Sequence, residues 1–417
     1  MDPTKKNPYA SAAAASTNPK QALPGAGKKV VVAMSGGVDS AVSAAILKRQ
    51  GYDVIGIALQ TTDYSKYLNN DSGGTCCSVK DMEDARRVSE KVGIPFYVLD
   101  TERTFDSAVV DYFVNDYLQG RTPNPCVMCN TKVKFNHLYR KAMDLGADYI
   151  ATGHYAKVSK EPDLGYCLWR STDSNKDQTY FLFNLTQRQL ERTLFPVGHL
   201  TKPEVRKLAE EFGLSVAEKP DSQEICFVPG NDYAKFIETR TAPSQRRPGH
   251  IVTAHKDVLG THEGIFRYTI GQRKGLGAAL DRAKQLGLPD AESLAVVKID
   301  PIKALVVLGP ERDLDQWGLL VTNVNFIVAP DLRMPRRIQV KVRYRSQLVE
   351  AEAKMLGDGR VEVRFVQPQR AITPGQACVF YDGNLCLGGG WIHETLHVDA
   401  SDRPSAEDNI PAAAFRT

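Results

Sequence analysis

Two kinds of hydrophobic periodicity occur along the chain. From Lys28 to about Ile225, apolar runs such as VVVAM, DVIGIAL, PFYVLD and DYIATG alternate with helical stretches such as AVSAAILKRQ and VKDMEDARRVSEKVG. This alternation is typical of an α/β domain with a parallel sheet. Beyond about residue 311, alternating runs are joined by hairpin turns, as in LVEAEAKML-GDG-RVEVRFV and ACVFY-DGN-LCLGG, and they predict a small all-β barrel.

The remaining segments complete the expected domain order. Short apolar runs between the two main patterns are broken by many glycines and prolines, which favours a small, loop-rich middle domain. Both ends of the chain lack a periodic apolar face and are expected to be disordered tails. The predicted order is a tail (1–27), a Rossmann-like parallel-sheet nucleotide domain (28–226), the middle domain (227–310), the β-barrel (311–398) and a second tail (399–417).

Composition excludes several classes of protein. A length of 417 residues suggests two or three domains, and eight cysteines are too sparse for a disulfide scaffold. The sparse cysteines and the absence of a secretory signal pattern favour a reducing cytoplasm. No apolar run approaches eighteen residues and the mean hydropathy is -0.31, so we expect no membrane partner. The net charge of +4 is too small to indicate a nucleic-acid partner by itself. Such a partner has to be inferred from local clusters of charge.

The most informative stretch is KKVVVAMSGGVDSAVSAAILKRQG, in which a buried-strand pattern passes through Ser35-Gly36-Gly37-Val38-Asp39-Ser40 into a helix. Glycines let backbone N–H groups approach a phosphate, and the start of the following helix favours negative charge. The loop is neither a Walker A sequence nor a GxGxxG fingerprint. It resembles the SGGxDS loop of the ATP pyrophosphatase (PP-loop) superfamily, which implies ATP binding and substrate adenylation with release of pyrophosphate.

Seven further motifs resemble one family of that superfamily, the tRNA-specific 2-thiouridylases, which thiolate the wobble uridine of tRNA. They are GRTPNPCVMCN, ATGHYAKV, NKDQTYFL, GHLTKPEVRKLA, DSQEICFV, YTIGQRKGLG and TPGQACVFYDG, and they cover most of the chain between its tails. The resemblance implies a tRNA substrate and a sulfur donor, either a persulfide-donating carrier or a cysteine desulfurase.

The resemblance also implies the site residues. ATP, with Mg²⁺, would lie against the loop and two further positions: Ala33, Met34, Ser35, Gly36, Gly37, Val38, Asp39, Ser40, Leu59 and Gly153. The tRNA contacts of the family would fall on Asn124, Pro125, Cys126, His154, Lys176, Asp177, Gln178, Arg343, Tyr344 and Gln376. Cys129 and Cys226 would be the two catalytic cysteines.

Thiolation chemistry explains why one protein would need both ATP and thiols. The C2 carbonyl oxygen of uracil is a poor leaving group and must first be activated, here as an adenylate. A persulfide on Cys226 would then deliver sulfur without releasing free sulfide, and Cys129 would complete the transfer by forming a disulfide with Cys226. Because an unperturbed thiol is only slightly ionised at neutral pH, Lys132 and Lys134 are candidates for supplying positive charge.

The other cysteines have a structural interpretation. Cys167, Cys378 and Cys386 stand in alternating or apolar runs and are predicted to be core residues, and a structural role is also favoured for Cys76 and Cys77. Structural zinc at Cys126 and Cys129 is disfavoured because no second CxxC or histidine pair lies nearby.

Local charge in RMPRRIQVKVRYR, residues 333–345, gives a separate indication of RNA binding. At a period of two, the apolar residues and Tyr344 face one way, whereas the basic residues Lys341, Arg343 and Arg345 face the other. A strand with one cationic face could follow phosphates, although a solvated charged face explains the same pattern.

Three alternatives remain open at the level of sequence. The chain could be another PP-loop RNA thiolase or an amide-forming ligase, or a non-catalytic protein that binds RNA or relays sulfur.

Within the thiolase interpretation, Cys126 departs from the common family pattern, which often has Asp there. With Cys126 present, three thiolates (Cys126, Cys129 and Cys226) could instead hold a [4Fe-4S] cluster with one iron open to the transferred sulfur.

Iron analysis separates the cluster from the persulfide route. If a cluster forms, protein purified without oxygen should be brown and carry about four irons per chain. Iron and activity should then be lost together in air and in each of Cys126→Ser, Cys129→Ser and Cys226→Ser. Full thiolation by iron-free protein with a persulfide donor, or by a Cys126→Asp variant, would contradict the cluster.

Overall fold

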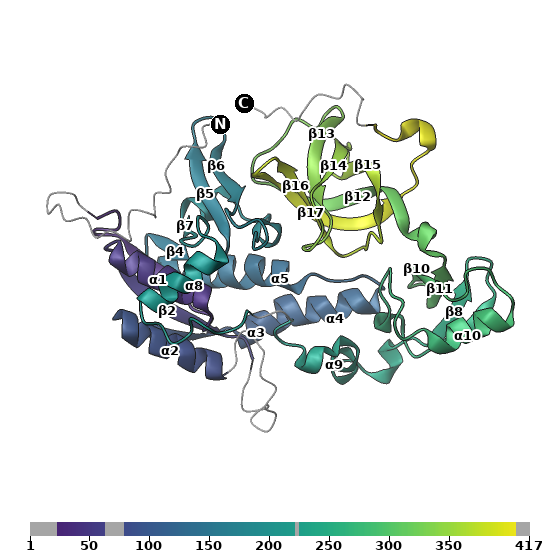
Figure 1. The fold of residues 1–417 in the computed structure, drawn as a ribbon, viewed down its shortest axis with the longest axis horizontal. Helices are drawn as coiled ribbons and strands as arrows, with labels where there is room; N and C mark the ends of the chain where they lie inside the picture. Colours follow the sequence, from purple (N-terminus) through teal and green to yellow (C-terminus); the bar gives the residue numbers. More distant parts are fainter. Residues whose placement is uncertain (1–22, 63–78, 222–224, 406–417) are drawn as a thin grey trace. The chain divides into compact units, whose positions relative to one another are not determined.

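The computed structural model describes residues 23–62, 79–221 and 225–405 and divides into two compact units (Figure 1). The first unit holds residues 1–109, 126–231 and 384–386, and the second holds residues 110–125, 232–383 and 387–417. Most of the two expected tails lies outside the described residues, as do Cys76 and Cys77. None of the helices in the described ranges is long and apolar enough to cross a membrane.

A five-stranded parallel sheet forms the centre of the first unit. Its order is β3-β2-β1-β4-β7. The strands are β1 (Lys29–Ala33), β2 (Asp53–Gln60), β3 (Phe96–Asp100), β4 (Tyr149–Ala151) and β7 (Thr193–Leu194). The first four coincide with the four apolar runs of the sequence, so the predicted parallel α/β pattern is confirmed.

Helices bury the centre of the sheet because β1 is apolar on both faces. Val30 and Val32 of β1 pack into a core with α1 (Val38–Arg49), α2 (Val79–Val92) and α8 (Lys202–Glu211). Val31 points to the opposite face and is also fully buried. A strand that is buried on both faces is typical of a Rossmann-like sheet.

The other elements of the first unit are short. The helical segments are α3 (Glu102–Phe105), α5 (Pro125–Met128), the π-helical η4 (Cys129–Leu138), α6 (Tyr139–Asp144), η5 (Thr179–Phe181) and α7 (Gln187–Glu191). A hairpin of β5 (Ala156–Glu161) and β6 (Gly165–Arg170) follows β4, and residues 385–386 pair with β6.

A small mixed sheet forms the middle part of the second unit, as expected from its many glycines and prolines. Its order is β10-β11-β8-β9, with only β11 and β8 parallel. The strands are β8 (Gly249–Thr253), β9 (Val258–His262), β10 (Ala295–Asp300) and β11 (Leu305–Gly309), and α10 (Gly277–Gln285) covers them. Two further helices, α4 (Asp111–Leu118) and α9 (Tyr233–Arg240), share a cluster of aromatic rings.

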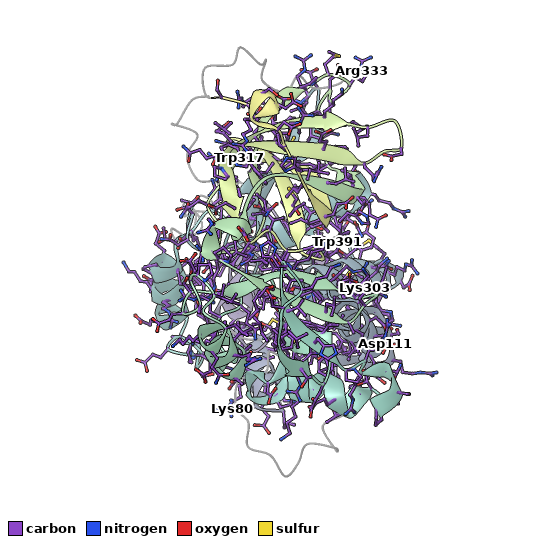
Figure 2. The ribbon with its side chains drawn as sticks, turned by 90° about the vertical axis from the view of Figure 1, so that its right-hand side faces the viewer. Lys80, Asp111, Lys303, Trp317, Arg333 and Trp391 are labelled. Atoms are coloured by element: carbon purple, nitrogen blue, oxygen red, sulfur yellow. The ribbon has the colours of Figure 1, made fainter. Side chains whose placement is uncertain are left out.

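Six antiparallel strands close into the predicted C-terminal barrel. They are β12 (Asp315–Phe326), β13 (Arg336–Lys341), β14 (Val349–Met355), β15 (Val361–Arg370), β16 (Ala377–Asp382) and β17 (Leu385–Leu396). Pairing of β12 with both β15 and β17 closes the barrel. Both predicted hairpins occur, as β14–β15 and β16–β17. Trp391 on β17, labelled in Figure 2, packs against Tyr112 with ring centroids 5.8 Å apart.

The basic strand is shorter than its sequence pattern predicts. Ile338, Val340 and Val342 are buried as expected, but β13 ends at Lys341. Arg343 and Tyr344 therefore lie in a turn, and the guanidinium group of Arg343 donates to the Ala371 carbonyl and the Thr373 hydroxyl. The prediction that the basic face continues along the strand to Arg345 is wrong, because these tertiary hydrogen bonds bend the chain.

Three predicted core cysteines are confirmed. Cys167 on β6, Cys378 on β16 and Cys386 on β17 are fully buried. Burial in apolar surroundings raises the pKa of the Cys378 thiol far above its usual range, which keeps it protonated and inert.

Arg343 and Arg345 should differ in their contribution to stability. Arg343→Ala removes a charged donor from two partly buried oxygens and is expected to cost about 1–3 kcal/mol of unfolding free energy. Arg345→Ala changes an exposed side chain and should stay within about 0.5 kcal/mol of the parent. Urea unfolding of the two variants compares them, and equal losses would show that the hydrogen bonds of Arg343 contribute nothing.

Candidate active site

The topology of the parallel sheet brings two loops together. Strand β1 lies between β2 and β4, so the strand order changes direction at β1. In open α/β sheets, ligands bind at such a switch point, beyond the carboxyl ends of the strands. The glycine loop, residues 34–40, follows β1 and includes the first three residues of α1. The loop at residues 152–154 follows β4. Leu59 lies near the end of the neighbouring strand β2.

Internal hydrogen bonds shape the loop after β1. The backbone N–H of Ser35 donates to Ser40 Oγ (3.2 Å), and that hydroxyl donates to the Gly37 carbonyl (3.1 Å). Helix α1 starts after Gly37 with no side-chain cap, so its first N–H groups point into the loop. Gly36 has φ +71°, and a Cβ there would lie 2.2 Å from the Asp81 carbonyl oxygen. Only glycine fits at this position.

Gly153 lets the second loop approach the first. A Cβ on Gly153 would lie 2.6 Å from the backbone nitrogen of Ser40 and 2.7 Å from the carbonyl carbon of Asp39. Real Cβ atoms do not tolerate such distances from a backbone. The missing side chain therefore allows the ends of β1 and β4 to form one site.

Asp39 is held by two side chains that come from other parts of the chain. Lys202 Nζ lies 2.7 Å and 2.9 Å from the two carboxylate oxygens, and the Tyr155 hydroxyl donates to Oδ1 (2.8 Å). Lys202 is the first residue of α8 and is only 7% exposed. This buried cation orients the only carboxylate of the loop.

A second carboxylate shares the same lysine. Asp221 Oδ1 lies 2.7 Å from Lys202 Nζ, and its other oxygen lies 2.8 Å from Lys176 Nζ. Arg206 is farther away, at 3.8 Å. Burial raises the pKa of Asp221, but hydrogen bonds from Lys176 and Lys202 outweigh it, so that the pKa falls below its usual range. Asp221 is therefore ionised at neutral pH.

Lys219 ties the loop to helix α2. Its ammonium group donates to Asp81 and Asp84 (2.6 Å each) and to the Gly36 carbonyl (3.0 Å). Two carboxylates around one lysine satisfy most of its donors. The glycine loop is thus fixed from the α2 side as well as from the α8 side.

The three predicted sulfur-site cysteines lie on two segments of the first unit. Cys126 on α5 is exposed, whereas Cys129 at the start of η4 and Cys226 in a turn are half-buried. Phe227 packs on Phe105 of α3 with ring centroids 5.5 Å apart, and α3 also contacts η4. Helix α3 is therefore a common neighbour of both cysteine segments.

These cysteines do not form a metal site in the structure. Within residues 23–62, 79–221 and 225–405, no three His, Cys, Asp or Glu side chains are arranged to hold a metal ion. A cluster on these three cysteines stays a prediction, which the iron content of the protein tests. Of the two lysines expected to activate a thiol, Lys132 is exposed, and Lys134 lies near enough to His154 to help lower its pKa.

Four of the predicted tRNA residues lie close to the glycine loop. His154 is buried beside Phe135 and Phe195, and burial lowers its pKa well below the usual range, so it is neutral. Gln178 exchanges hydrogen bonds with the backbone of Tyr155, and the buried Asp177 accepts from the backbone of Ser171 (3.1 Å). Lys176, on the same segment, reaches Asp221.

Other predicted tRNA residues lie in the second unit. The Gln376 amide donates to the carbonyls of Thr122 and Pro123 (3.0 Å each), and the Thr122 N–H donates to the Pro374 carbonyl (2.9 Å). The Asn124 N–H donates to the Tyr112 hydroxyl (3.3 Å). The barrel thus fixes the loop at residues 121–125.

Sequence reasoning missed the four residues that hold the loop: Tyr155, Lys202, Lys219 and Asp221. All four stand in or beside the quoted motifs, but Lys202 is 163 positions from Asp39. The one local signal is the T-x-x-E capping box at Thr201, which marks the start of α8 and hence the place of Lys202.

The sheet topology and the glycine loop define a nucleotide-binding protein of the PP-loop class. Family models match three segments: a tRNA methyl transferase HUP domain (28–230), a tRNA methyl transferase PRC-barrel domain (234–310) and an aminomethyltransferase beta-barrel domain (316–392). The chain is 50% identical over 371 residues to the tRNA-specific 2-thiouridylase MnmA of Geobacter metallireducens, covering 88% of this chain and 98% of that relative. It is 49% identical over 369 residues to MnmA of Clostridium perfringens, with 88% and 99% covered. The chain therefore belongs to the tRNA-specific 2-thiouridylase family.

A solved structure gives a weaker likeness. The U34-tRNA thiolase NcsA from Methanococcus maripaludis, with its [4Fe-4S] cluster, matches 54% of this chain and 70% of its own at 18% identity, with a TM-score of 0.32.

Gly153→Ala should loosen the loop. The added methyl group would collide with the backbone at residues 39–40, and relief of that collision is expected to cost about 1–3 kcal/mol of stability. Urea unfolding and hydrogen exchange of the α1 amides measure the effect. Gly277→Ala is the matched control, since its Cβ would meet open space. Exchange in α1 that is unchanged by Gly153→Ala would contradict the close approach.

Proposed function

We propose that this chain is an ATP-dependent tRNA sulfurtransferase that converts the C2 carbonyl of the wobble uridine to a thiocarbonyl. The observation that carries the proposal is the convergence of an uncapped helix start, a glycine loop and an oriented carboxylate, within a family of tRNA 2-thiouridylases. The first two features suit phosphate binding, and Asp39 would hold the Mg²⁺ carried by ATP, because Mg²⁺ prefers carboxylate oxygens.

The first chemical step is adenylation. The C2 oxygen of the uracil attacks the α-phosphorus of ATP, the bond to the β,γ-pyrophosphate breaks, and pyrophosphate leaves. The amides at the start of α1 would neutralise charge on the phosphates, and the close approach of Gly153 holds the loop after β4 against the start of that helix. The C2 oxygen is then part of a good leaving group, because it can depart with AMP when a nucleophile attacks C2.

Sulfur transfer follows at the cysteines. A persulfide on Cys226 attacks C2 and expels AMP, which leaves C2 joined to Cys226 through two sulfur atoms. The Cys129 thiolate then attacks the Cys226 sulfur, so a Cys129–Cys226 disulfide forms and the electron pair of the broken S–S bond stays on the tRNA sulfur. An external thiol reductant and a persulfide donor must restore the starting state. Half-burial of both residues suits thiols that must react and still be reloaded.

Two sets of variants separate the two halves of the reaction. With tRNA, ATP and a persulfide donor, mass analysis of tRNA nucleosides should show a 2-thiouridine derivative at the wobble position. Cys129→Ser and Cys226→Ser should lower its yield by roughly a thousandfold or more while tRNA-dependent pyrophosphate release persists. Asp39→Asn should lose both products and still bind tRNA.

The alternatives predict different products. An amide-forming ligase would release pyrophosphate without any thiolated nucleoside, and a thiolase of another base would leave the wobble uridine unmodified. A protein that only binds RNA or relays sulfur would show no tRNA-dependent pyrophosphate release.

A further inference from the structure

Four charged side chains form a continuous row in the first unit. Lys176 contacts Asp221 (2.8 Å), Asp221 contacts Lys202 (2.7 Å), and Lys202 contacts Asp39 (2.7 Å). The charges alternate in sign along the row. One end belongs to the segment of predicted tRNA contacts, and the other end belongs to the glycine loop.

Exposure of these side chains differs along the row. The side chain of Lys176 is 37% exposed and that of Asp39 is 29% exposed, whereas that of Lys202 is only 9% exposed. Both ends are therefore accessible to ligands, and of the two central residues Asp221 is 26% exposed while Lys202 is nearly buried. A nearly buried lysine must keep a carboxylate partner, because an unpaired buried charge is strongly destabilising.

A second, more rigid connection joins the same two segments. The Tyr155 N–H donates to Gln178 Oε1 (2.9 Å), the Gln178 N–H donates to the Tyr155 carbonyl (2.9 Å), and the Tyr155 hydroxyl donates to Asp39. The backbone N–H of Lys202 also donates to Asp173 Oδ2 (3.0 Å), upstream of Lys176. These bonds fix the distance between the two ends of the row, so a change of charge at one end acts on the other without a large movement.

We propose that Asp221 and Lys202 are positioning residues that couple tRNA binding at Lys176 to nucleotide binding at Asp39. The proposal rests on the proposed function, because it takes tRNA and MgATP as the two ligands. The Lys202 ammonium group contacts both Asp39 and Asp221. Each ligand would change how strongly Lys202 binds one carboxylate relative to the other.

The coupling follows from competition for charges. A tRNA phosphate beside Lys176 draws that ammonium group away from Asp221. Asp221 then holds Lys202 more strongly, which weakens the contact of Lys202 with Asp39. An oxygen of Asp39 becomes available for Mg²⁺, so bound tRNA should tighten the binding of MgATP. By linkage, MgATP should tighten the binding of tRNA by the same factor.

The test measures the affinity for an ATP analogue with and without saturating tRNA. The analogue is α,β-methylene ATP with Mg²⁺, whose α,β bridge blocks adenylation. In the parent protein, tRNA should tighten its binding by about tenfold, a typical coupling between two sites. In Asp221→Asn, which keeps the shape of the side chain and removes its charge, the factor should fall to within about twofold of unity.

Two further variants complete the test. Lys176→Gln changes an exposed end of the row and should lose the coupling in the same way at saturating tRNA. Glu211→Gln is the matched control, because it removes a carboxylate from an exposed ion pair with Lys207 on the same helix α8, and it should keep the factor of the parent.

The outcomes separate this inference from the proposed function. A parent protein that makes no thiolated nucleoside would contradict the proposed function. An active parent whose analogue affinity ignores tRNA would overturn the coupling, as would an unchanged factor in both Asp221→Asn and Lys176→Gln.

Discussion

The pairing of the buried Lys202 with two carboxylates is the interaction on which the candidate site depends. Lys202 lies at the start of α8, Asp39 in the loop after β1, and Asp221 ten residues past the end of α8. A buried lysine is costly unless it is paired, and two buried or half-buried carboxylates offset that cost only when all three segments are in place. The conformation of the glycine loop therefore depends on the complete first unit, and not on the sequence of the loop alone.

Steric constraints act on the same loop as the charges. Gly36 and Gly153 allow backbone-to-backbone approach on two sides, while Lys219 fixes the Gly36 carbonyl and Lys202 fixes Asp39. A loop held in this way keeps its N–H groups oriented before a ligand arrives. Such preorganisation matters for phosphoryl chemistry, because donors that are already aligned do not have to reorganise as charge develops.

Much of the fold could be predicted from the sequence, because it follows from local patterns. Strand β1, the glycine loop and α1 stand in one stretch, and both barrel hairpins carry their own turn residues. The end of β13 could not be predicted, since Arg343 is drawn to Ala371 and Thr373, which lie 28 and 30 positions away. The same reason hid Lys202 as a partner of Asp39. Long-range pairing of polar side chains has no period, so a sequence pattern does not reveal it.

The first unit separates two kinds of chemistry that need different surroundings. In the proposed mechanism, phosphate activation would use fixed, half-buried charges around the buried Lys202, because a lower dielectric strengthens their action on the nucleotide. In the proposed mechanism, sulfur transfer would use the half-buried thiols on segments beside α3, because a persulfide must be loaded, attacked and reduced in turn. Any PP-loop enzyme needs the first arrangement, and a ligase would need nothing more. The two half-buried cysteines have no use in ligation, and their presence in the same unit as such a loop favours a sulfurtransferase over its nearest mechanistic alternatives.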